Sequence, residues 1–306
     1  MKNMKQKIVP FLWFDTRAEE AANLYISIFK NSGINSITRF PGAGKEIHKK
    51  ETGSVMTVDF DLENFRMVAL NGGPEFNFNS SISFFVLFDD AAELDRVWNA
   101  LLKEGDLLMP LDQYDWSSRY GWLKDRFGVN WQLMLEEKRS TPEAIVPMIF
   151  FTGKNQGKAE EAVNYYTSIF KNSNIEGILR YGDENPFAKG HVMHSQFTLE
   201  NQTFMAMDSG MENDFPFTEA ISFMVNCKDQ QEIDYYWNKL TEGGDPAAQQ
   251  CGWLKDKFGV SWQVTPEEIN KILNNPDKEK ANRVMDAVLK MKKFDLEELD
   301  RAAERI

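Results

Sequence analysis

The stretch that decides the fold occurs twice. Residues Gly121–Gln132 read GWLKDRFGVNWQ, and residues Gly252–Gln263 read GWLKDKFGVSWQ. The two copies differ at two aligned pairs, Arg126/Lys257 and Asn130/Ser261. Self-similarity over such a distance is the signature of a duplicated structural unit, so the rest of the chain should repeat as well.

Other blocks do return in the same order. Ile8–Pro10 returns as Ile145–Pro147, Ala18–Ala21 as Ala159–Ala162, Ser27–Ser32 as Ser168–Ser173, and Ile82–Phe84 as Ile221–Phe223. A repeat of this length is a whole domain rather than a solenoid unit. We therefore expect a first domain at residues 1–137, a linker at 138–144, a second domain at 145–265 and a helical tail at 266–306.

Inside each copy, apolar residues alternate between the period of a strand and that of a helix. In the first copy, a Thr16–Glu19 capping box predicts the start of a helix, and Glu63-Asn64 predicts a tight turn. Asp90 with Glu93 caps a second helix. Strands are expected at residues 8–14, 34–40, 54–62, 65–71, 82–88, 121–124 and 129–135. Each copy thus predicts two βαβββ units.

Two segments fall outside this pattern. Leu107–Tyr120 has no counterpart in the second copy, and we expect a loop there, either a lid or a surface elaboration that packs on the other copy. In the tail, Pro266 is expected to open a helix through Leu273, followed by helices at 278–292 and 296–303. Their apolar stripes need a partner surface, on the domains or on another chain.

Composition narrows the class of protein. The 306 residues carry a formal net charge of −12, which disfavours contact with nucleic-acid phosphates and anionic lipids. The apolar stretch Ile8–Phe14 is short and lacks a small-residue cleavage site, so it predicts a strand rather than a signal peptide. The two cysteines, Cys227 and Cys251, provide no disulfide framework. We expect a cytoplasmic protein with no nucleic-acid or membrane partner.

Several strings resemble one known family. They are Pro10–Asp15 (PFLWFD), Ala18–Ala21 (AEEA), Tyr25–Ser32 (YISIFKNS), Ala69–Pro74 (ALNGGP) and Cys251–Gln263 (CGWLKDKFGVSWQ). Twice, over nearly its whole length, the chain resembles the PhnB-like family of the vicinal-oxygen-chelate superfamily, which includes glyoxalases, bleomycin-resistance proteins and dioxygenases. The family also carries the label 3-demethylubiquinone-9 3-methyltransferase.

This resemblance implies an α+β fold of tandem glyoxalase/bleomycin-resistance-like domains. Paired βαβββ modules would form curved mixed sheets, each a cup around a small-molecule site. Related single-domain proteins often complete the cup by dimerisation. A tandem chain would make that contact within itself, as an intramolecular pseudo-dimer, and a further homodimer is left open.

Metal-using members of the superfamily place His or Glu at four sheet positions that face the cup. By alignment of the repeated turn, these positions fall near Val9, Ala69, Ser83 and Gln132 in the first copy, and near Val146, Ala206, Ser222 and Gln263 in the second. None of them is a His or a carboxylate, and the chain has three His in all: His48, His191 and His194. A catalytic divalent site needs about three such ligands, so we expect no metal and no cofactor.

Other catalytic sets are not evident either. A Rossmann-type methyltransferase needs a glycine-rich turn between a first strand and a helix, whereas Gly42–Lys45 follows a later strand and is not expected to open a helix. Asp125 and Asp256 are expected to hold β-turns, and Cys251 to pack. The sequence leans against an enzyme and does not support the methyltransferase label.

What remains is a cup lined by amides, hydroxyls and aromatic rings. The candidate ligand-binding residues are Trp13, Asn71, Ser83, Trp122 and Gln132 in the first copy and Phe150, Asp208, Ser222, Trp253 and Gln263 in the second. Asp208 in place of Asn71 predicts that the second cup accepts a cationic or hydrogen-bond-donating group. Because buried amides and hydroxyls need partners, we expect a small-molecule-binding protein without a complete metal site.

Two alternative functions stay open. One is a glyoxalase-like lyase or isomerase, or another metal-dependent enzyme. The other is a structural or regulatory protein whose cups are filled by its own side chains.

Overall fold

The computed structural model of the chain describes residues 6–138, 141–267, 269 and 277–304. The first copy contains β1 (Ile8–Phe14), α1 (Ala18–Ile28), β2 (Gly33–Arg39), α2 (Lys45–His48), β3 (Val55–Leu62), β4 (Phe65–Asn71), β5 (Ile82–Phe88), α3 (Ala91–Leu102), β6 (Asp106–Tyr114), β7 (Ser117–Lys124) and β8 (Asn130–Leu135). The second contains β9 (Ile145–Phe151), η1 (Gly153–Asn155), α4 (Ala159–Ile169), β10 (Asn174–Arg180), β11 (Val192–Leu199), β12 (Gln202–Asp208), β13 (Ile221–Cys227), α5 (Gln230–Thr241), η2 (Pro246–Ala248), β14 (Trp253–Lys255) and β15 (Ser261–Pro266). The tail contains α7 (Lys278–Val288) and α8 (Leu296–Glu304).

The strands form two mixed sheets, and each sheet combines strands from both copies. Sheet A has the order β14-β15-β13-β1-β4-β3-β2, and sheet B has the order β10-β11-β12-β9-β5-β8-β7-β6. In each, the first four strands of one copy join the last strands of the other through an antiparallel pair, β1–β13 or β9–β5. The boundaries of the repeat therefore do not coincide with the boundaries of the sheets.

The two junctions have the same register. Ile8 faces Val225 in the β1–β13 pair, and its repeat counterpart Ile145 faces Val86 in the β9–β5 pair. Exchanging the copies therefore maps one sheet onto the other, apart from the additional strand β6 in sheet B. This correspondence lets every position on one sheet be compared with its counterpart on the other.

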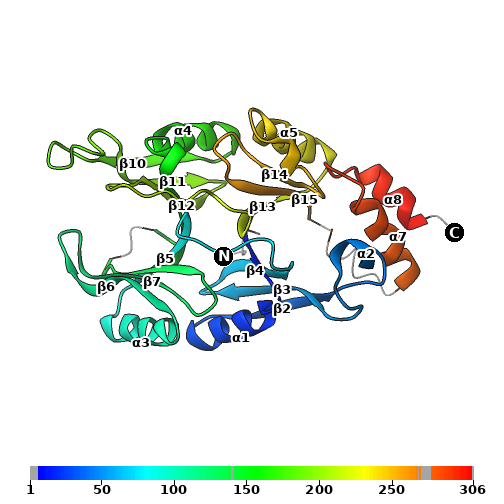
Figure 1. Cartoon of the computed structure of the whole chain (residues 1–306), viewed down its shortest axis with the longest axis horizontal. Helices are drawn as coiled ribbons and strands as arrows, with labels where there is room; N and C mark the ends of the chain where they lie inside the picture. The colour runs from blue at the N-terminus through cyan, green and yellow to red at the C-terminus, as the bar shows by residue number, and fades with distance from the viewer. Residues whose placement is uncertain (1–5, 139–140, 268, 270–276, 305–306) are drawn as a thin grey trace.

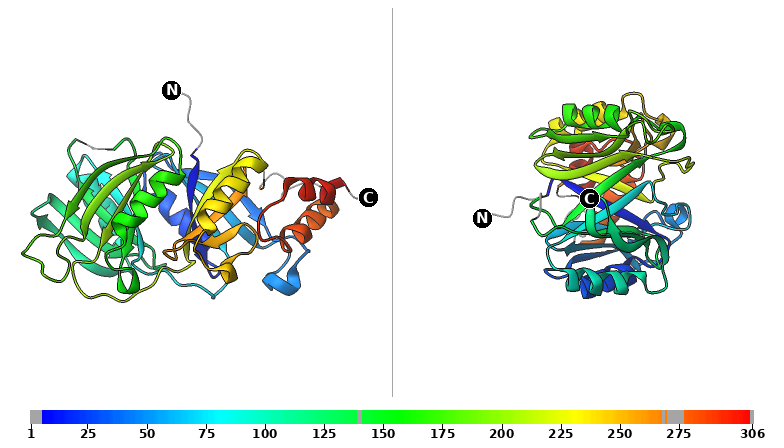
Figure 2. Two further views of the ribbon diagram at one scale, coloured as in Figure 1. Left: turned by 90° about the horizontal axis from the view of Figure 1, so that it is seen from above. Right: turned by 90° about the vertical axis from the view of Figure 1, so that its left-hand side faces the viewer.

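Helices cover one face of each sheet, which we call the outer face. Figures 1 and 2 show α1 and α3 along one side of the molecule and α4 and α5 along the opposite side, with the strands between. The main core lies between these helices and the outer faces, where Tyr25, Trp131, Tyr166 and Trp262 are fully buried. The opposite, inner faces carry two separate apolar clusters, which leaves them as the candidate sites.

Some local signals in the sequence predicted the structure correctly, and others did not. The turn at Glu63-Asn64 is confirmed, since both residues have positive φ, and Asp90 caps α3 by accepting the Glu93 N–H as predicted. The Thr16–Glu19 capping box is wrong, because no side chain of the adjoining turn caps α1. Leu107–Tyr120 is not a loop: most of it forms the β6–β7 hairpin, which extends sheet B by a strand.

The tail packs on the domains, so its apolar stripe has found an intramolecular partner. Val284, Val288 and Met291 join the main core, and the tail lies beside α2 and α5 (Figure 1). Pro266 is the last residue of β15, and Ile269, within the range of the predicted helix, is helical. The rest of the helix predicted through Leu273 falls mainly outside the described residues.

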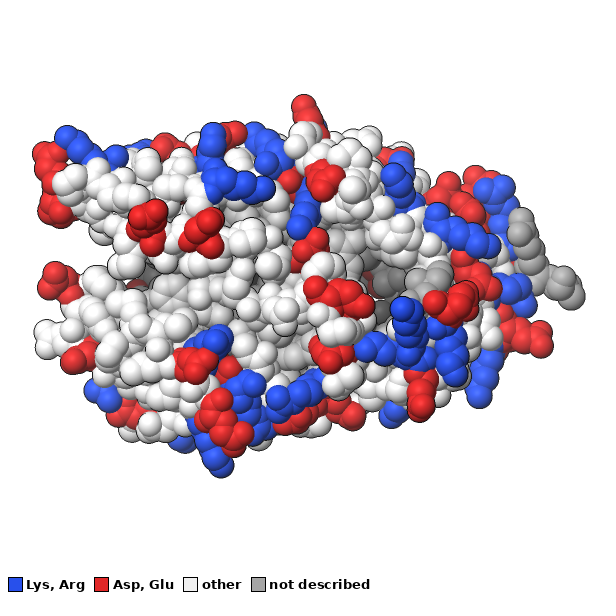
Figure 3. All heavy atoms as spheres, in the orientation of Figure 1, with Lys and Arg blue, Asp and Glu red and all other residues white. Residues whose placement is uncertain are grey.

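Charges are interspersed on the surface. Figure 3 shows acidic and basic side chains along the upper and lower margins of one face, with a broad band of uncharged residues between them. Among the described residues, no helix is both long and apolar enough to cross a membrane.

Candidate functional site

The inner face of sheet A carries a small apolar cluster. It consists of Val9, Phe11, Val68 and Met224, with the partly buried Leu70 and Trp253 packed against it. Ser222 and Gln263 belong to the same face, because Ser222 pairs with Phe11 and Gln263 pairs with both Met224 and Trp253.

The inner face of sheet B carries a larger and more methionine-rich cluster. Its members are Phe85, Leu87, Tyr120, Trp122, Val146, Met148, Phe150 and Met205, with Met109, Tyr114, Met134, Met207 and Phe215 packed against them. Met148, Met205 and Met207 stand where sheet A has Phe11, Val68 and Leu70. His194 also lies here, with its ring 6.5 Å from that of Phe85, and burial lowers the pKa of its imidazole.

The predicted grouping of candidates by copy is wrong. Sheet A brings Trp13 of the first copy together with Ser222, Trp253 and Gln263 of the second. Sheet B brings Phe150 of the second copy together with Ser83, Trp122 and Gln132 of the first. The reason is the exchange of half-domains between the sheets, which a comparison of local patterns does not reveal.

Asn71 and Asp208 do not lie on an inner face. They pair with Phe14 and Phe151, whose rings pack in the outer core. Asn71 Oδ1 accepts the Ala18 N–H at 2.8 Å, which supplies the cap that the predicted capping box does not.

Asp208 binds three backbone N–H groups, at distances of 2.9 to 3.1 Å. Burial nevertheless raises the pKa of its carboxyl, an effect that these hydrogen bonds oppose. Asp208 thus caps the start of α4 and does not face the cup, so it gives the cup no preference for a cationic group.

Two of the positions aligned with the metal ligands of metal-using relatives were assigned one residue out of register. Ala69 and Ala206 belong to the outer core, so the inner-face residues on those strands are Val68, Leu70, Met205 and Met207. On each sheet, the four inner-face positions that correspond to metal ligands in those relatives then hold one amide and one hydroxyl among apolar side chains. These two groups bond each other, Gln263 Nε2 to Ser222 Oγ at 2.9 Å and Gln132 Nε2 to Ser83 Oγ at 2.8 Å.

Such a set does not fit a divalent transition metal, which takes imidazole, thiolate or carboxylate ligands. Nowhere in the described ranges do three His, Cys, Asp or Glu residues come together in a group suited to a metal ion.

Aromatic rings form one wall of the sheet A face. The ring of Trp253 lies 5.6 Å from that of Trp13 and 5.8 Å from that of Phe11, in edge-to-face arrangements. Trp13 is held in place by the bond from its Nε1 to the Gly73 carbonyl, 2.8 Å, and by the absence of a side chain at Gly72, where a Cβ would meet the ring at 2.1 Å. The two glycines of the ALNGGP string therefore position this tryptophan.

The polar groups of the sheet B face satisfy one another. Tyr120 donates to Gln132 Oε1 at 2.5 Å, and Trp122 Nε1 donates to Asn130 Oδ1 at 3.2 Å. Asn130 in turn donates to the carbonyls of Asn79 and Gly128.

On the sheet A face, Gln263 and Ser222 bond each other, but other polar groups there are left without partners in the described residues. Ser261 replaces Asn130, and the buried Trp253 Nε1 and Ser261 Oγ both lack a hydrogen-bond partner in the described structure. Cys251 replaces Tyr120, and its Sγ lies 3.3 Å from the Val288 carbonyl oxygen in the tail, not at Gln263. Sequence reasoning missed Ser261, although the Asn130/Ser261 difference in the repeated motif was the signal for it.

Asp125 and Asp256 hold the predicted turns and also join elements. In each, Oδ1 accepts two backbone N–H groups of the turn. Oδ2 accepts a helix tyrosine, Tyr25 or Tyr166, at 2.7 Å, and the tryptophan of the next strand at 2.9 Å. Four donors explain why a buried carboxyl is tolerated, and burial still raises the pKa of both groups, that of Asp256 to about 6.

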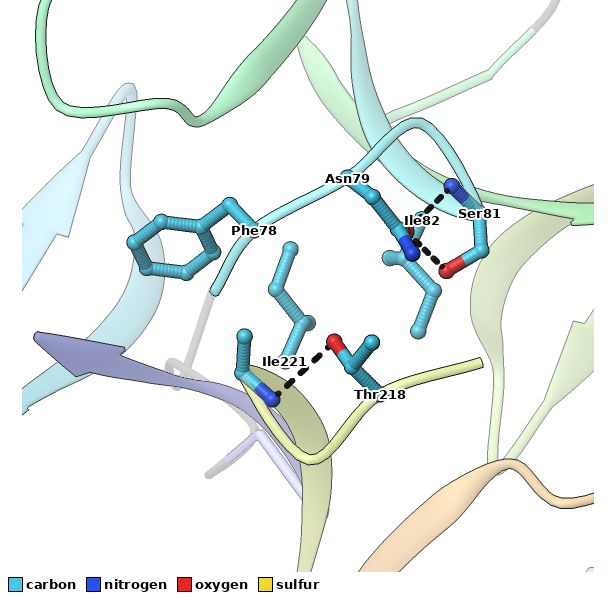
Figure 4. Close-up of a pocket in the computed structure, with 7 residues that line it drawn as sticks. Phe78, Asn79, Ser81, Ile82, Thr218 and Ile221 are labelled. Atoms are coloured by element: carbon cyan, nitrogen blue, oxygen red, sulfur yellow. Dashed lines mark hydrogen bonds between the residues drawn. The ribbon is translucent and has the colours of Figure 1, made fainter. Parts of the chain in front are cut away.

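Two pockets lie outside the inner faces. Figure 4 shows the first, which lies between the segments that lead into β5 and β13. Across this seam, Asn79 also donates to the Pro216 carbonyl and Thr218 to the Asn77 carbonyl. It is a filled seam. The second, about 320 Å³, lies on the surface between Thr152, Lys154 and Asn155 and the segment 214–216.

The Gly42–Lys45 segment does open a helix, contrary to expectation. That helix, α2, has four residues, and Gly44 at its start has φ +73. A Cβ there would meet Leu289 of the tail at 2.4 Å, so the glycine allows the tail to dock. The Gly42–Lys45 segment therefore serves as a surface on which the tail docks, and it does not have the structure of a cofactor-binding loop.

Comparisons with known proteins agree with this architecture. The family model described as 3-demethylubiquinone-9 3-methyltransferase matches residues 6–134 and 143–265. A PhnB protein from Bacillus cereus is 37% identical over 43% of this chain and 100% of its own, with a TM-score of 0.39. Glyoxalase I from Zea mays is 10% identical over 88% of this chain and 95% of its own, with a TM-score of 0.51, a likeness of fold. No curated protein matched.

The two matched regions contain the two copies of the repeated motif, Gly121–Gln132 and Gly252–Gln263. The chain therefore belongs, in two tandem copies, to the family described as 3-demethylubiquinone-9 3-methyltransferase.

Proposed function

We propose that the inner face of sheet A binds a small planar organic molecule, while the inner face of sheet B is filled by its own side chains. One observation carries the proposal: Trp253 Nε1 and Ser261 Oγ are buried without a partner among the described residues, whereas their counterparts on sheet B are paired. A buried polar group without a partner costs about 1–3 kcal/mol, so a ligand that satisfies both groups recovers that free energy.

The surroundings of these two groups favour a flat ligand. Trp13 and Trp253 are half-buried and offer ring faces and edges beside the polar pair. A molecule with an acceptor for the indole N–H and a donor for the Gln263 carbonyl would use both kinds of contact. Aromatic amides and phenols combine a ring with an acceptor and a donor at one edge, whereas quinones offer the ring and the acceptor alone.

The two alternatives fare differently. A filled, structural face describes sheet B well, because its hydrogen bonds close on themselves. A metal-dependent enzyme has no support from the central residues of either sheet. The methyltransferase activity named in the family's description gains none from Gly42–Lys45, which docks the tail. Location in the cytoplasm and a further homodimer stay predictions.

The test compares matched variants of the two faces. Naphthamide, naphthol and naphthoquinone are titrated into the protein by calorimetry, the last representing the quinone class in the family's description. Ser261→Asn gives sheet A the amide that pairs the indole in sheet B, and should lower the affinity at least about tenfold. Asn130→Ser, on sheet B, should leave it unchanged.

The proposal fails if the wild type binds none of the three probes. It also fails if Ser261→Asn and Asn130→Ser change the affinity equally. Gln263→Ala and Gln132→Ala form a second pair, in which only the first should weaken binding.

A further inference from the structure

A third buried group without a partner lies on the inner face of sheet A. Thr265 Oγ1 has no hydrogen-bond partner among the described residues, and the side chain is 5% exposed. Ser261, Gln263 and Thr265 alternate with Trp262 and Val264, which point into the outer core. The three polar residues therefore form one row along β15, on the face that holds Trp253.

The row has a definite length. At a rise of about 3.3 Å per residue, Ser261 and Thr265 lie about 13 Å apart along the strand. Sheet B does not have the same row, since Met134 occupies the position of Thr265. The hydroxyl at the far end is thus a second feature, after Ser261, that distinguishes sheet A from its filled counterpart.

The far end of the row lies where the tail docks. Just before β14, the strand next to β15, the backbone N–H groups of Cys251 and Gly252 donate to the carbonyls of Met291 and Lys292 at 2.8 and 2.7 Å. Val264, next to Thr265, donates its N–H to the Gly252 carbonyl. The tail therefore borders the end of the face at which Thr265 is buried.

We infer that the ligand of sheet A is elongated and two-ended: a planar ring with a polar edge lies beside Trp253 and Ser261, and a hydrogen-bonding group about 13 Å away reaches Thr265. This inference rests on the proposed function and adds the ligand's shape to it. Between the two ends, the ligand crosses Gln263, Met224 and Val9, which form a largely apolar middle.

The test uses naphthamides whose nitrogen carries an alkyl chain with a terminal hydroxyl, from hydroxyethyl to hydroxydodecyl. Affinity for the wild type should pass through a maximum at the chain that spans the row. Thr265→Val keeps the shape and removes the hydroxyl, so it should abolish the gain at that maximum, about tenfold, and leave plain naphthamide binding unchanged. Thr265→Ser should restore the gain.

The outcomes separate the two levels of the proposal. If plain naphthamide binds and Ser261→Asn weakens it, but no chain length improves affinity, or Thr265→Val does not remove the gain, the elongated ligand is refuted and the binding face stands. Chains that end in a methyl group serve as the control. They should show no maximum that depends on Thr265. If no naphthamide binds at all, both levels fail together.

Discussion

A reciprocal exchange of Asn130 and Ser261 should move stability in opposite directions. Asn130 is fully buried, accepts the Trp122 indole N–H and the Ser80 hydroxyl, and donates to two backbone carbonyls. Asn130→Ser removes the amide that pairs these four groups and opens a small cavity, so we expect a loss of about 2–4 kcal/mol. Ser261→Asn instead supplies a partner to the orphaned Trp253 Nε1, and should stabilise the fold by about 1 kcal/mol.

Urea unfolding measures both effects. The midpoint should fall for Asn130→Ser and rise for Ser261→Asn, with the slope of free energy against urea unchanged in both. Most substitutions at fully buried sites destabilise, so the rise is the discriminating result. If Ser261→Asn destabilises the protein as much as its reciprocal, Trp253 Nε1 is not an unsatisfied donor, and the difference between the two faces has been misread.

Three further predictions follow from single contacts. Burial raises the pKa of Asp256 to about 6, above the unfolded value of about 3.9, so the stability that this raised pKa contributes is complete below about pH 4 and is lost as the pH rises through about 6. Asp256→Asn should remove that part of the pH dependence of the free energy of urea unfolding, and an unaltered pH profile would contradict the prediction. Gly72→Ala, whose Cβ would meet the Trp13 ring at 2.1 Å, should abolish naphthamide binding, whereas Gly33→Ala, with open space around it, should not. Gly44→Ala should loosen the tail and speed tryptic cleavage there, with Gly33→Ala again as the reference; equal cleavage rates would exclude the docking role.

The repeated motif was enough to predict the duplication, because GWLKD and the residues around it specify the same turn and strands twice, whereas the curved mixed sheets were predicted from the family resemblance. The exchange of half-domains was not predictable from such local signals. Ile8 pairs with Val225, more than 200 residues away in sequence, and the apolar alternation of β1 would suit several partners equally.

Errors in the candidate site came from register. A shift of one residue along a strand moves a side chain to the other face, which is why Asn71 and Ala69 were both misplaced. Ser83, Gln132, Ser222 and Gln263 lie on inner faces, where the alignment of the repeated turn had placed them. Whether a polar group is paired depends on its neighbours in space, so the orphaned Trp253 Nε1 became visible only in the structure.

The difference between the two faces can be read directly at their tryptophans. In an NMR spectrum of protein labelled on the indole nitrogens, the 8 indole N–H signals can be assigned by Trp→Phe variants. On titration with naphthamide, the Trp253 signal should shift saturably and its hydrogen exchange should slow, as its N–H gains an acceptor, while the Trp122 signal stays in place. A shift of Trp122 with Trp253 unmoved, or no shift of either at saturating naphthamide, would contradict a binding face on sheet A.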